Sequence, residues 1–158
     1  MRRVRVLQIG DQVPQFRMEA GTGEVVDSRE LVGKRWVIYF YPKDNTSGCT
    51  IETREFGLAQ EALLARGVLV FGCSVGDAAA KKSFAASCGA TGLPLLADPD
   101  HKVAEQFGVW QLRKSADGEH MGIARTTFLI GKDGMVERVW EGVKPEGHAQ
   151  EVLDTTAA

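Results

Sequence analysis

Residues 35–41, RWVIYFY, form a short run of β-branched and aromatic side chains that ends at Pro42. A continuous apolar run of this length predicts a strand that is buried on both faces. The polar stretch 43–48, KDNTSG, follows, and then a helix that runs to about Ala65 or Arg66, with Gly67 as its C-terminal stop. Residues 68–74, VLVFGCS, are the next apolar run. A strand, a helix and a strand at this spacing form a βαβ unit, whose two strands are parallel.

The rest of the chain continues the alternation less regularly. The expected elements are a helix at 77–88 capped by Asp77, a strand at 93–96, a helix at 103–107, strands at 125–131 and 135–140 joined by an Asp133-Gly134 turn, and a helix at 145–153. They predict a mixed central sheet, parallel then antiparallel, flanked by helices on both faces. This is the layout of a thioredoxin-like α/β fold. The sequence contains no internal repeat or linker, so we expect a single domain over residues 1–158.

Composition narrows the range of partners and compartments. Hydrophobic residues make up 44% and charged residues 25% of the 158, as in ordinary globular proteins. The formal net charge is −2, and the basic cluster at residues 2–5 is too short to follow a phosphate backbone, so no nucleic acid is expected as a partner. The apolar run after this cluster stops at Gln8, and no other stretch is long enough to span a membrane. We therefore expect a cytoplasmic protein.

The chain has three widely spaced cysteines, Cys49, Cys73 and Cys88. An odd number without close pairs argues against a secreted disulfide framework and against zinc, and no cofactor or metal is expected. The histidines at positions 101, 120 and 148 lie in polar segments, and each is expected to be a solvated surface residue.

Cys49 is expected in the first turn of the helix that follows the polar loop, with Thr46 or Ser47 as the N-cap. It shares one helical stripe with Phe56 and Leu63, so it should lean toward the sheet. Free backbone N–H groups and the helix dipole favour a thiolate there, so the pKa of this thiol should lie below about 8.5. The alternative is a buried cysteine that serves as a small apolar side chain, and placement alone does not decide between the two.

Residues 40–50, FYPKDNTSGCT, closely resemble the active-site signature of the peroxiredoxins, in particular the bacterioferritin comigratory protein (Q-type) branch. Four further blocks match in the same order, at residues 72–75, 94–102, 106–110 and 125–130. The resemblance covers about residues 8–155 and implies the thioredoxin-like fold that the pattern predicts. It implies a thiol peroxidase, an antioxidant enzyme that reduces hydrogen peroxide and organic hydroperoxides and is recycled by thioredoxin.

The resemblance also implies a role for each matching residue. Cys49 is the peroxidatic cysteine, which becomes a sulfenic acid when its thiolate breaks the peroxide O–O bond. Thr46 donates a hydrogen bond to the peroxide or the thiolate, and Pro42 shapes and shields the loop. Arg125 holds the sulfur and a peroxide oxygen with its fork of donors, although without the resemblance an exposed strand arginine is the ordinary interpretation. Backbone N–H groups of Gly48 and Cys49 serve the same end.

The sequence departs from the family at the second cysteine, which many relatives carry five residues after the first and where this chain has Arg54. Cys73 falls in a predicted central strand, where it is expected to be inert packing. Two outcomes stay open: Cys88 resolves Cys49 as an intramolecular disulfide, or an external thiol does so in a one-cysteine cycle. Glu52 has the wrong sign to lower a thiol pKa and is assigned no catalytic role.

Three other functions predict different residues near Cys49. A disulfide oxidoreductase of the same fold needs a cysteine where Glu52 stands. A cysteine hydrolase needs a histidine base, and none of the three histidines lies in a suitable block. A non-enzymatic binding domain has no reason to carry Pro42, Thr46, Cys49 and Arg125 together. The expected partners are a peroxide and a thiol reductant, with a monomer as the default and a weak dimer as the alternative.

Overall fold

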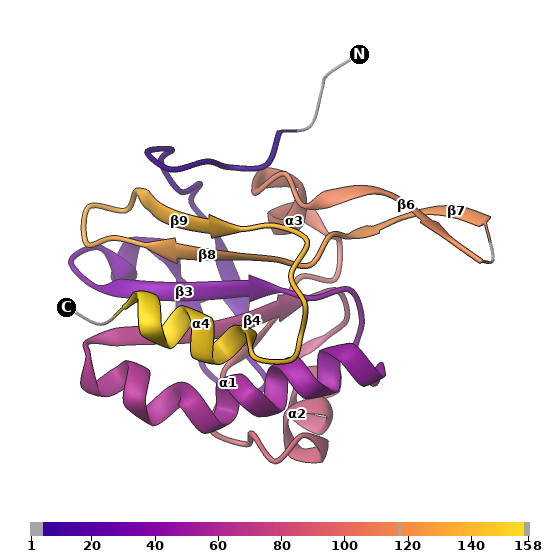
Figure 1. Ribbon diagram of the computed structural model, residues 1–158, viewed down its shortest axis with the longest axis horizontal. Coiled ribbons are helices and arrows are strands. Elements are labelled where there is room, and N and C mark those ends of the chain that lie inside the picture. The colour runs from indigo at the N-terminus through magenta and orange to yellow at the C-terminus, as the bar shows by residue number, and fades with distance from the viewer. Residues whose placement is uncertain (1–4, 117, 157–158) are drawn as a thin grey trace.

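The computed structural model describes residues 5–116 and 118–156. A central five-stranded sheet has the order β5-β4-β3-β8-β9 (Figure 1). These strands are β3 (Arg35–Phe40), β4 (Val68–Ser74), β5 (Leu95–Ala97), β8 (Thr126–Ile130) and β9 (Val136–Trp140). The pairs β3–β4 and β4–β5 are parallel, whereas β3–β8 and β8–β9 are antiparallel. The predicted mixed sheet is therefore confirmed.

Helices cover both faces of this sheet. On one face lie α1 (Ser47–Ala65), α2 (Ala78–Ser87) and α4 (His148–Thr155), whose buried residues share one core cluster. The other face carries α3 (Lys102–Gln106), the hairpin of β1 (Arg17–Glu19) and β2 (Val25–Asp27), and the short helix η1 (Ser28–Leu31). The sheet thus separates two cores. The loop that leads into α1 begins at the carboxyl end of β3.

The central strand β3 explains why the fold has two cores. Every residue of β3 after Arg35 is buried, and successive side chains point to opposite faces of a sheet. Trp36, Ile38 and Phe40 enter the core under α3, and Val37 and Tyr39 enter the core under α1. An uninterrupted apolar run, rather than an alternating one, is what a strand covered on both faces requires.

Helices α1, which carries Cys49, and α2, whose C-cap is Cys88, begin and end close to their expected positions. Helix α1 ends before Gly67, whose φ of 75° is the left-handed conformation that glycine adopts without strain. Helix α2 begins after Asp77, whose carboxylate accepts a hydrogen bond from the Ala80 N–H at 2.8 Å. The last helix starts later than expected, at His148, because the preceding residue is Gly147 with a φ of 80°.

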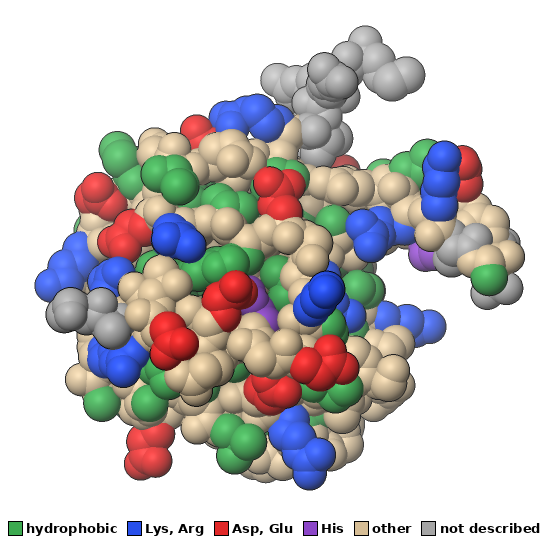
Figure 2. Space-filling view, in the orientation of Figure 1, with side chains coloured by type: hydrophobic (Ala, Val, Ile, Leu, Met, Phe, Trp, Pro, Cys, Tyr) green, Lys and Arg blue, Asp and Glu red, His purple; other side chains and the backbone are tan. Residues whose placement is uncertain are grey.

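The sequence interpretation missed a hairpin formed by β6 (Trp110–Ser115) and β7 (Gly118–Ile123). This hairpin projects from the body of the molecule (Figure 1). On the face drawn in Figure 2, acidic and basic side chains are interspersed, in keeping with a net charge of −2. Within the described residues, no helix has the length and apolar character that crossing a membrane would require.

Candidate active site

Cys49 lies in the first turn of α1 and is fully buried. Phe56 and Leu63 are buried in the same core, so the predicted stripe along α1 is confirmed. The Phe56 ring stacks on Tyr39 of the central strand, with ring centroids 4.4 Å apart. The helix is therefore anchored to the sheet by its apolar stripe, and that anchoring fixes where the Cys49 sulfur points.

A single guanidinium group connects Cys49 to the carboxylate of Glu52. Arg125, which immediately precedes β8, places Nη2 3.4 Å from Cys49 Sγ and Nη1 2.7 Å from Glu52 Oε1. Its side chain is 16% exposed, so it is not the solvated strand arginine of the ordinary interpretation. The fork of donors on one planar group lets Arg125 hold the sulfur and the carboxylate at fixed positions together.

Gly48 makes this close approach possible. A Cβ atom at Gly48 would lie 3.1 Å from Arg125 Nη2 and 3.3 Å from Pro145 Cγ. Both distances are tighter than ordinary van der Waals contact, so a larger residue would displace one of these neighbours. The glycine before Cys49 thus allows Arg125 and the segment around Pro145 to close over the first turn of α1.

Glu52 is the site residue that the sequence interpretation missed. It is 1% exposed, and its Oε2 has no hydrogen-bond partner among the described residues. Burial raises the pKa of Glu52 to about 7, although Arg125 acts in the opposite direction. The available signal was spacing: Glu52 follows Cys49 by three residues, which puts both on one face of a helix.

The loop before α1 carries the other residues of the predicted site. Thr46 occupies the N-cap position as expected, but its hydroxyl donates to the Lys43 carbonyl at 3.0 Å instead of capping the helix. The carbonyl of Thr46 in turn accepts the Thr50 hydroxyl at 2.7 Å. Pro42 is half-buried, two residues after the end of β3. Asp44 accepts hydrogen bonds from the Tyr41 hydroxyl and from Lys81 of α2, which ties the loop to that helix.

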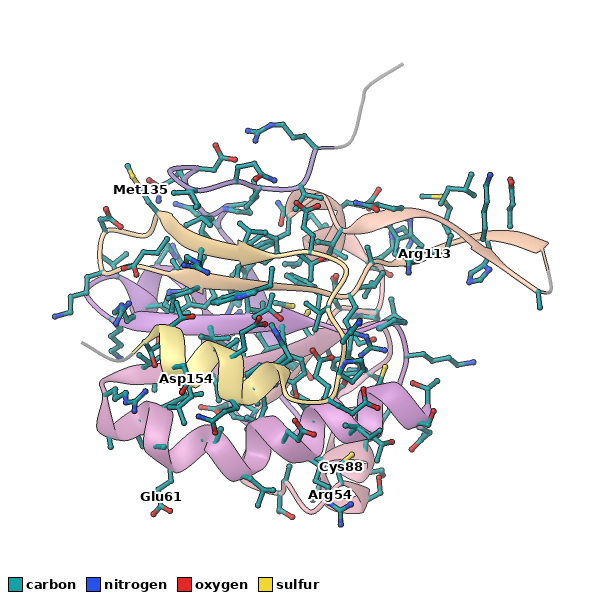
Figure 3. All side chains as sticks on the ribbon, in the orientation of Figure 1. Arg54, Glu61, Cys88, Arg113, Met135 and Asp154 are labelled. Carbon is teal, nitrogen blue, oxygen red and sulfur yellow. The ribbon has the colours of Figure 1, made fainter. Side chains whose placement is uncertain are left out.

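The other two cysteines are also free and buried, but they have different surroundings. Burial raises the pKa of Cys88, while the hydroxyls of Ser87 and Thr50 act to lower it. The hydroxyl of Thr50 places Cys88 beside the first turn of α1, and Arg54 lies near it as well (Figure 3). Burial raises the pKa of Cys73, in β4, well above its usual range, and its Sγ lies 3.8 Å from Met18 Sδ.

The expectation that all three histidines are solvated is wrong for His148. This residue is buried, with Nε2 2.8 Å from Thr127 Oγ1 and Nδ1 2.9 Å from Glu151 Oε1. Its ring packs edge-on against Phe56 and Trp140, because the first turn of α4 rests on α1 and β9. Among the described residues, no hydrogen bond joins a histidine to Cys49, and no group of three or more His, Cys, Asp or Glu side chains could hold a metal.

Comparison with known proteins places this arrangement in a family. The model of the AhpC/TSA family matches residues 9–139. The chain belongs to the AhpC/TSA family. It is 38% identical to peroxiredoxin Bcp of Bacillus subtilis (strain 168) over 149 residues, which are 94% of each chain. The family resemblance drawn from residues 40–50 is thereby confirmed.

Two solved structures of family members agree with the fold. A Cys-to-Ser mutant of Xylella fastidiosa PrxQ matches with a TM-score of 0.88 and 31% identity, over 96% of each chain. Xanthomonas campestris bacterioferritin comigratory protein, solved in a study of its alkyl peroxide reduction, matches with a TM-score of 0.85 and 30% identity, over 96% of each chain. These findings confirm the thioredoxin-like α/β fold and the assignment of the chain to the thiol-dependent peroxidases.

Proposed function

We propose that Cys49 is the peroxidatic residue and that its thiolate attacks the terminal oxygen of a peroxide. A sulfur–oxygen bond forms, the O–O bond breaks, and the displaced alkoxide or hydroxide takes a proton from water. Cys49 becomes a sulfenic acid, so sulfur is oxidised and the peroxide is reduced to an alcohol or water. The observation that carries this proposal is the contact between Arg125 and Cys49 Sγ at 3.4 Å, at the start of a helix.

Negative charge moves from sulfur to oxygen during this step, so fixed donors around both atoms lower the barrier. Arg125 supplies a permanent charge, and Glu52 holds its Nη1 so that Nη2 stays on the sulfur. The backbone N–H groups of Gly48 and Cys49 supply donors for the peroxide, and the Thr46 hydroxyl adds a third when it turns from the Lys43 carbonyl to the bound peroxide. Pro42, which has no N–H group, closes the wall of the loop. In this proposal Glu52 is a positioning residue rather than a catalytic one.

We further propose that Cys88 resolves the sulfenic acid. The Cys88 thiol attacks the Cys49 sulfur, which releases water and leaves a disulfide within the chain. A thiol reductant, with thioredoxin as the proposed donor, then returns both cysteines to thiols. The location of Cys88 beside the first turn of α1 supports this assignment. Three free cysteines suit a reducing compartment, which supports a cytoplasmic enzyme.

The proposed substrates are hydrogen peroxide and organic hydroperoxides. The organic class is suggested by the alkyl peroxide reduction of the Xanthomonas campestris relative. Competition between hydrogen peroxide and an alkyl hydroperoxide for the reduced protein, read as the rate of loss of each peroxide, tests this choice. Equal loss of both supports the broad substrate range, and loss of hydrogen peroxide alone contradicts it.

Peptide mapping under non-reducing conditions tests the cycle directly. One equivalent of peroxide should give a Cys49–Cys88 cross-link within one chain, and dithiothreitol should reverse it. The Cys88→Ser variant is the matched control, and it should stop at a sulfenic acid on Cys49. Persistent sulfenic acid in the unsubstituted protein, with Cys88 still open to alkylation, would instead establish the one-cysteine cycle.

A further inference from the structure

A buried ion pair joins the loop before Cys49 to helix α2. Lys81 of α2 is 0% exposed, and its Nζ lies 3.1 and 3.0 Å from the two carboxylate oxygens of Asp44. The same Nζ donates to the Val75 carbonyl and lies 5.5 Å from the centre of the Tyr41 ring. The Tyr41 hydroxyl donates to Asp44 Oδ1 at 2.7 Å. We call Tyr41, Asp44 and Lys81 the loop–helix network.

The loop–helix network connects the two segments that carry the proposed reactive cysteines. Asp44 precedes Cys49 by five residues and lies in the loop that leads into α1. Lys81 precedes Cys88 by seven residues, which is two turns of α2, so both lie on the buried face of that helix. The ion pair therefore spans the gap between the Cys49 segment and the Cys88 segment.

The sulfurs of Cys49 and Cys88 have different neighbours in the structure. The Cys49 sulfur faces Arg125, whereas Cys88 lies beside Thr50, the next residue along α1. Successive residues of an α-helix differ in direction by about 100°, so Cys49 does not face Cys88. A disulfide requires a sulfur–sulfur distance of about 2.05 Å and Cα atoms about 4.4–6.8 Å apart. Forming the proposed disulfide therefore requires Cys49 to leave Arg125, which moves the first turn of α1.

We propose that the loop–helix network is a latch that controls how the Cys49 sulfenic acid is consumed. The inference rests on the proposed function of Cys49 and Cys88. With the latch closed, the sulfenic acid stays in the site and meets a second peroxide. The second peroxide transfers one oxygen atom to the sulfur. The sulfenic acid is thereby oxidised to a sulfinic acid, and the peroxide is reduced to an alcohol or water. With the latch open, Cys88 reaches the sulfur, and the disulfide and water form instead.

The chemistry of the pair fits a latch better than apolar packing does. Among the described residues, the hydrogen-bond partners of the two charges are each other, Tyr41 and Val75, and opening the loop breaks these hydrogen bonds together. Losing one partner of such a pair leaves the other charge buried and uncompensated, which is strongly unfavourable. Replacing both partners by neutral side chains removes the latch without leaving an unpaired charge.

The test compares Lys81→Met with Lys82→Met, the exposed lysine that follows it on α2. Each protein turns over excess peroxide in the presence of dithiothreitol, and intact mass gives the fraction of Cys49 that becomes sulfinic acid per turnover. We expect this fraction to fall at least about tenfold in Lys81→Met, because Asp44 then lacks its buried partner and the open loop is favoured. The fraction should stay unchanged in Lys82→Met. Equal fractions in both variants would overturn the proposal.

Two further variants separate a latch from a general loss of structure. The Asp44→Asn/Lys81→Met double variant leaves no unpaired buried charge, and it should also form less sulfinic acid. In a Cys88→Ser background there is no disulfide to compete, so Lys81→Met should leave the rate of sulfinic acid formation within about twofold. A fall in that background as well would show a damaged peroxide site and contradict the latch. A lack of any Cys49 oxidation in the unsubstituted protein would instead contradict the proposed function.

Discussion

Two buried cysteines in this molecule differ in what surrounds the sulfur rather than in how deeply it lies. Cys49 and Cys73 are both fully buried. Cys49 lies at the start of a helix with the Arg125 guanidinium 3.4 Å from its sulfur. Cys73 lies inside β4, paired with Phe40 of β3, and its sulfur lies against Met18. The central sheet separates them, since each belongs to a different core.

Exposure does not distinguish these two thiols, because both are fully buried. Burial without a compensating charge disfavours a thiolate, and it raises the pKa of Cys73 well above the usual range. The Cys49 sulfur, by contrast, contacts the Arg125 guanidinium at the start of α1. A cysteine side chain therefore serves as apolar packing in one core, at Cys73, and as the proposed nucleophile in the other, at Cys49.

The largest expected effect comes from removing one thiol at a time. Cys49→Ser should abolish peroxide consumption, because a hydroxyl does not ionise usefully in this site. Cys73→Ser, the matched control in the other core, should keep near-normal activity even though it lowers stability. Peroxide loss is followed with a thiol reductant present. More than a few per cent of the activity in Cys49→Ser, or a comparable loss in Cys73→Ser, would contradict the comparison.

The second prediction removes the charge that distinguishes Cys49. Arg125→Ala and Arg125→Lys should both lower the rate of Cys49 oxidation by about 10²–10³, by analogy with the loss of one oxyanion-hole donor. Lysine should not rescue the enzyme, because a single ammonium cannot reach both Cys49 and Glu52 as the fork does. Stopped-flow oxidation measures the rate, and Arg138→Lys on β9 is the control. A lysine variant with wild-type rates would show that the fork is not required.

The third prediction shifts Arg125 without removing it. Gly48→Ala introduces a Cβ 3.1 Å from Arg125 Nη2, and a displacement of a few tenths of an ångström should lower the rate of Cys49 oxidation about tenfold. Gly92→Ala is a suitable control, because its Cβ would make only an ordinary contact, at 3.9 Å, with Gln60. The same rapid oxidation assay compares the two variants. Equal rates would show that Arg125 tolerates the displacement.

The smallest expected effect on activity comes from Glu52→Gln, which should change stability more than rate. Burial raises the pKa of Glu52 from 4.5 to about 7, so the folded protein binds this proton more tightly than the unfolded chain. The stability that Glu52 contributes is full below pH 4.5 and is lost as the pH rises through about 7. At about 1.4 kcal/mol per pH unit, the loss is about 3 kcal/mol.

Urea unfolding of the reduced protein between pH 4.5 and 8 checks this expectation. The free energy of unfolding should fall with pH in the unsubstituted protein relative to Glu52→Gln. Glu61→Gln, on the outer face of α1 (Figure 3), should keep the pH dependence of the unsubstituted protein. If the free energy of unfolding changes with pH in the same way in the unsubstituted protein and in Glu52→Gln, the buried carboxylate is already ionised at pH 4.5.

The sequence was sufficient for features that local patterns control. The apolar runs of β3 and β4, the stripe of α1 and the burial of Cys73 follow from periodicity and spacing. The hairpin of β6 and β7 was missed, although Trp110, Leu112, Met121 and Ile123 alternate with polar residues and glycine as paired strands do. That signal was present in the sequence.

Other features depend on which distant segments meet, and the sequence pattern could not supply them. Glu52 and Arg125 are 73 residues apart in the sequence. Their ion pair exists because the start of β8 brings Arg125 over the first turns of α1. His148 is buried because α4 folds back onto Phe56 and Trp140. Lys81 looks like a surface residue in the sequence, and it becomes buried only when α2 meets the loop that carries Asp44.

We propose that the surroundings of Cys49, and not its exposure, make it the thiol that peroxide oxidises first. The direct measurement adds less than one equivalent of peroxide to the reduced protein, alkylates it at once, and maps the peptides that contain Cys49, Cys73 and Cys88. We predict that oxidised sulfur appears first at Cys49, while Cys73 stays a free thiol in the folded protein. Oxidation of Cys73 or Cys88 in molecules whose Cys49 is still reduced would contradict it.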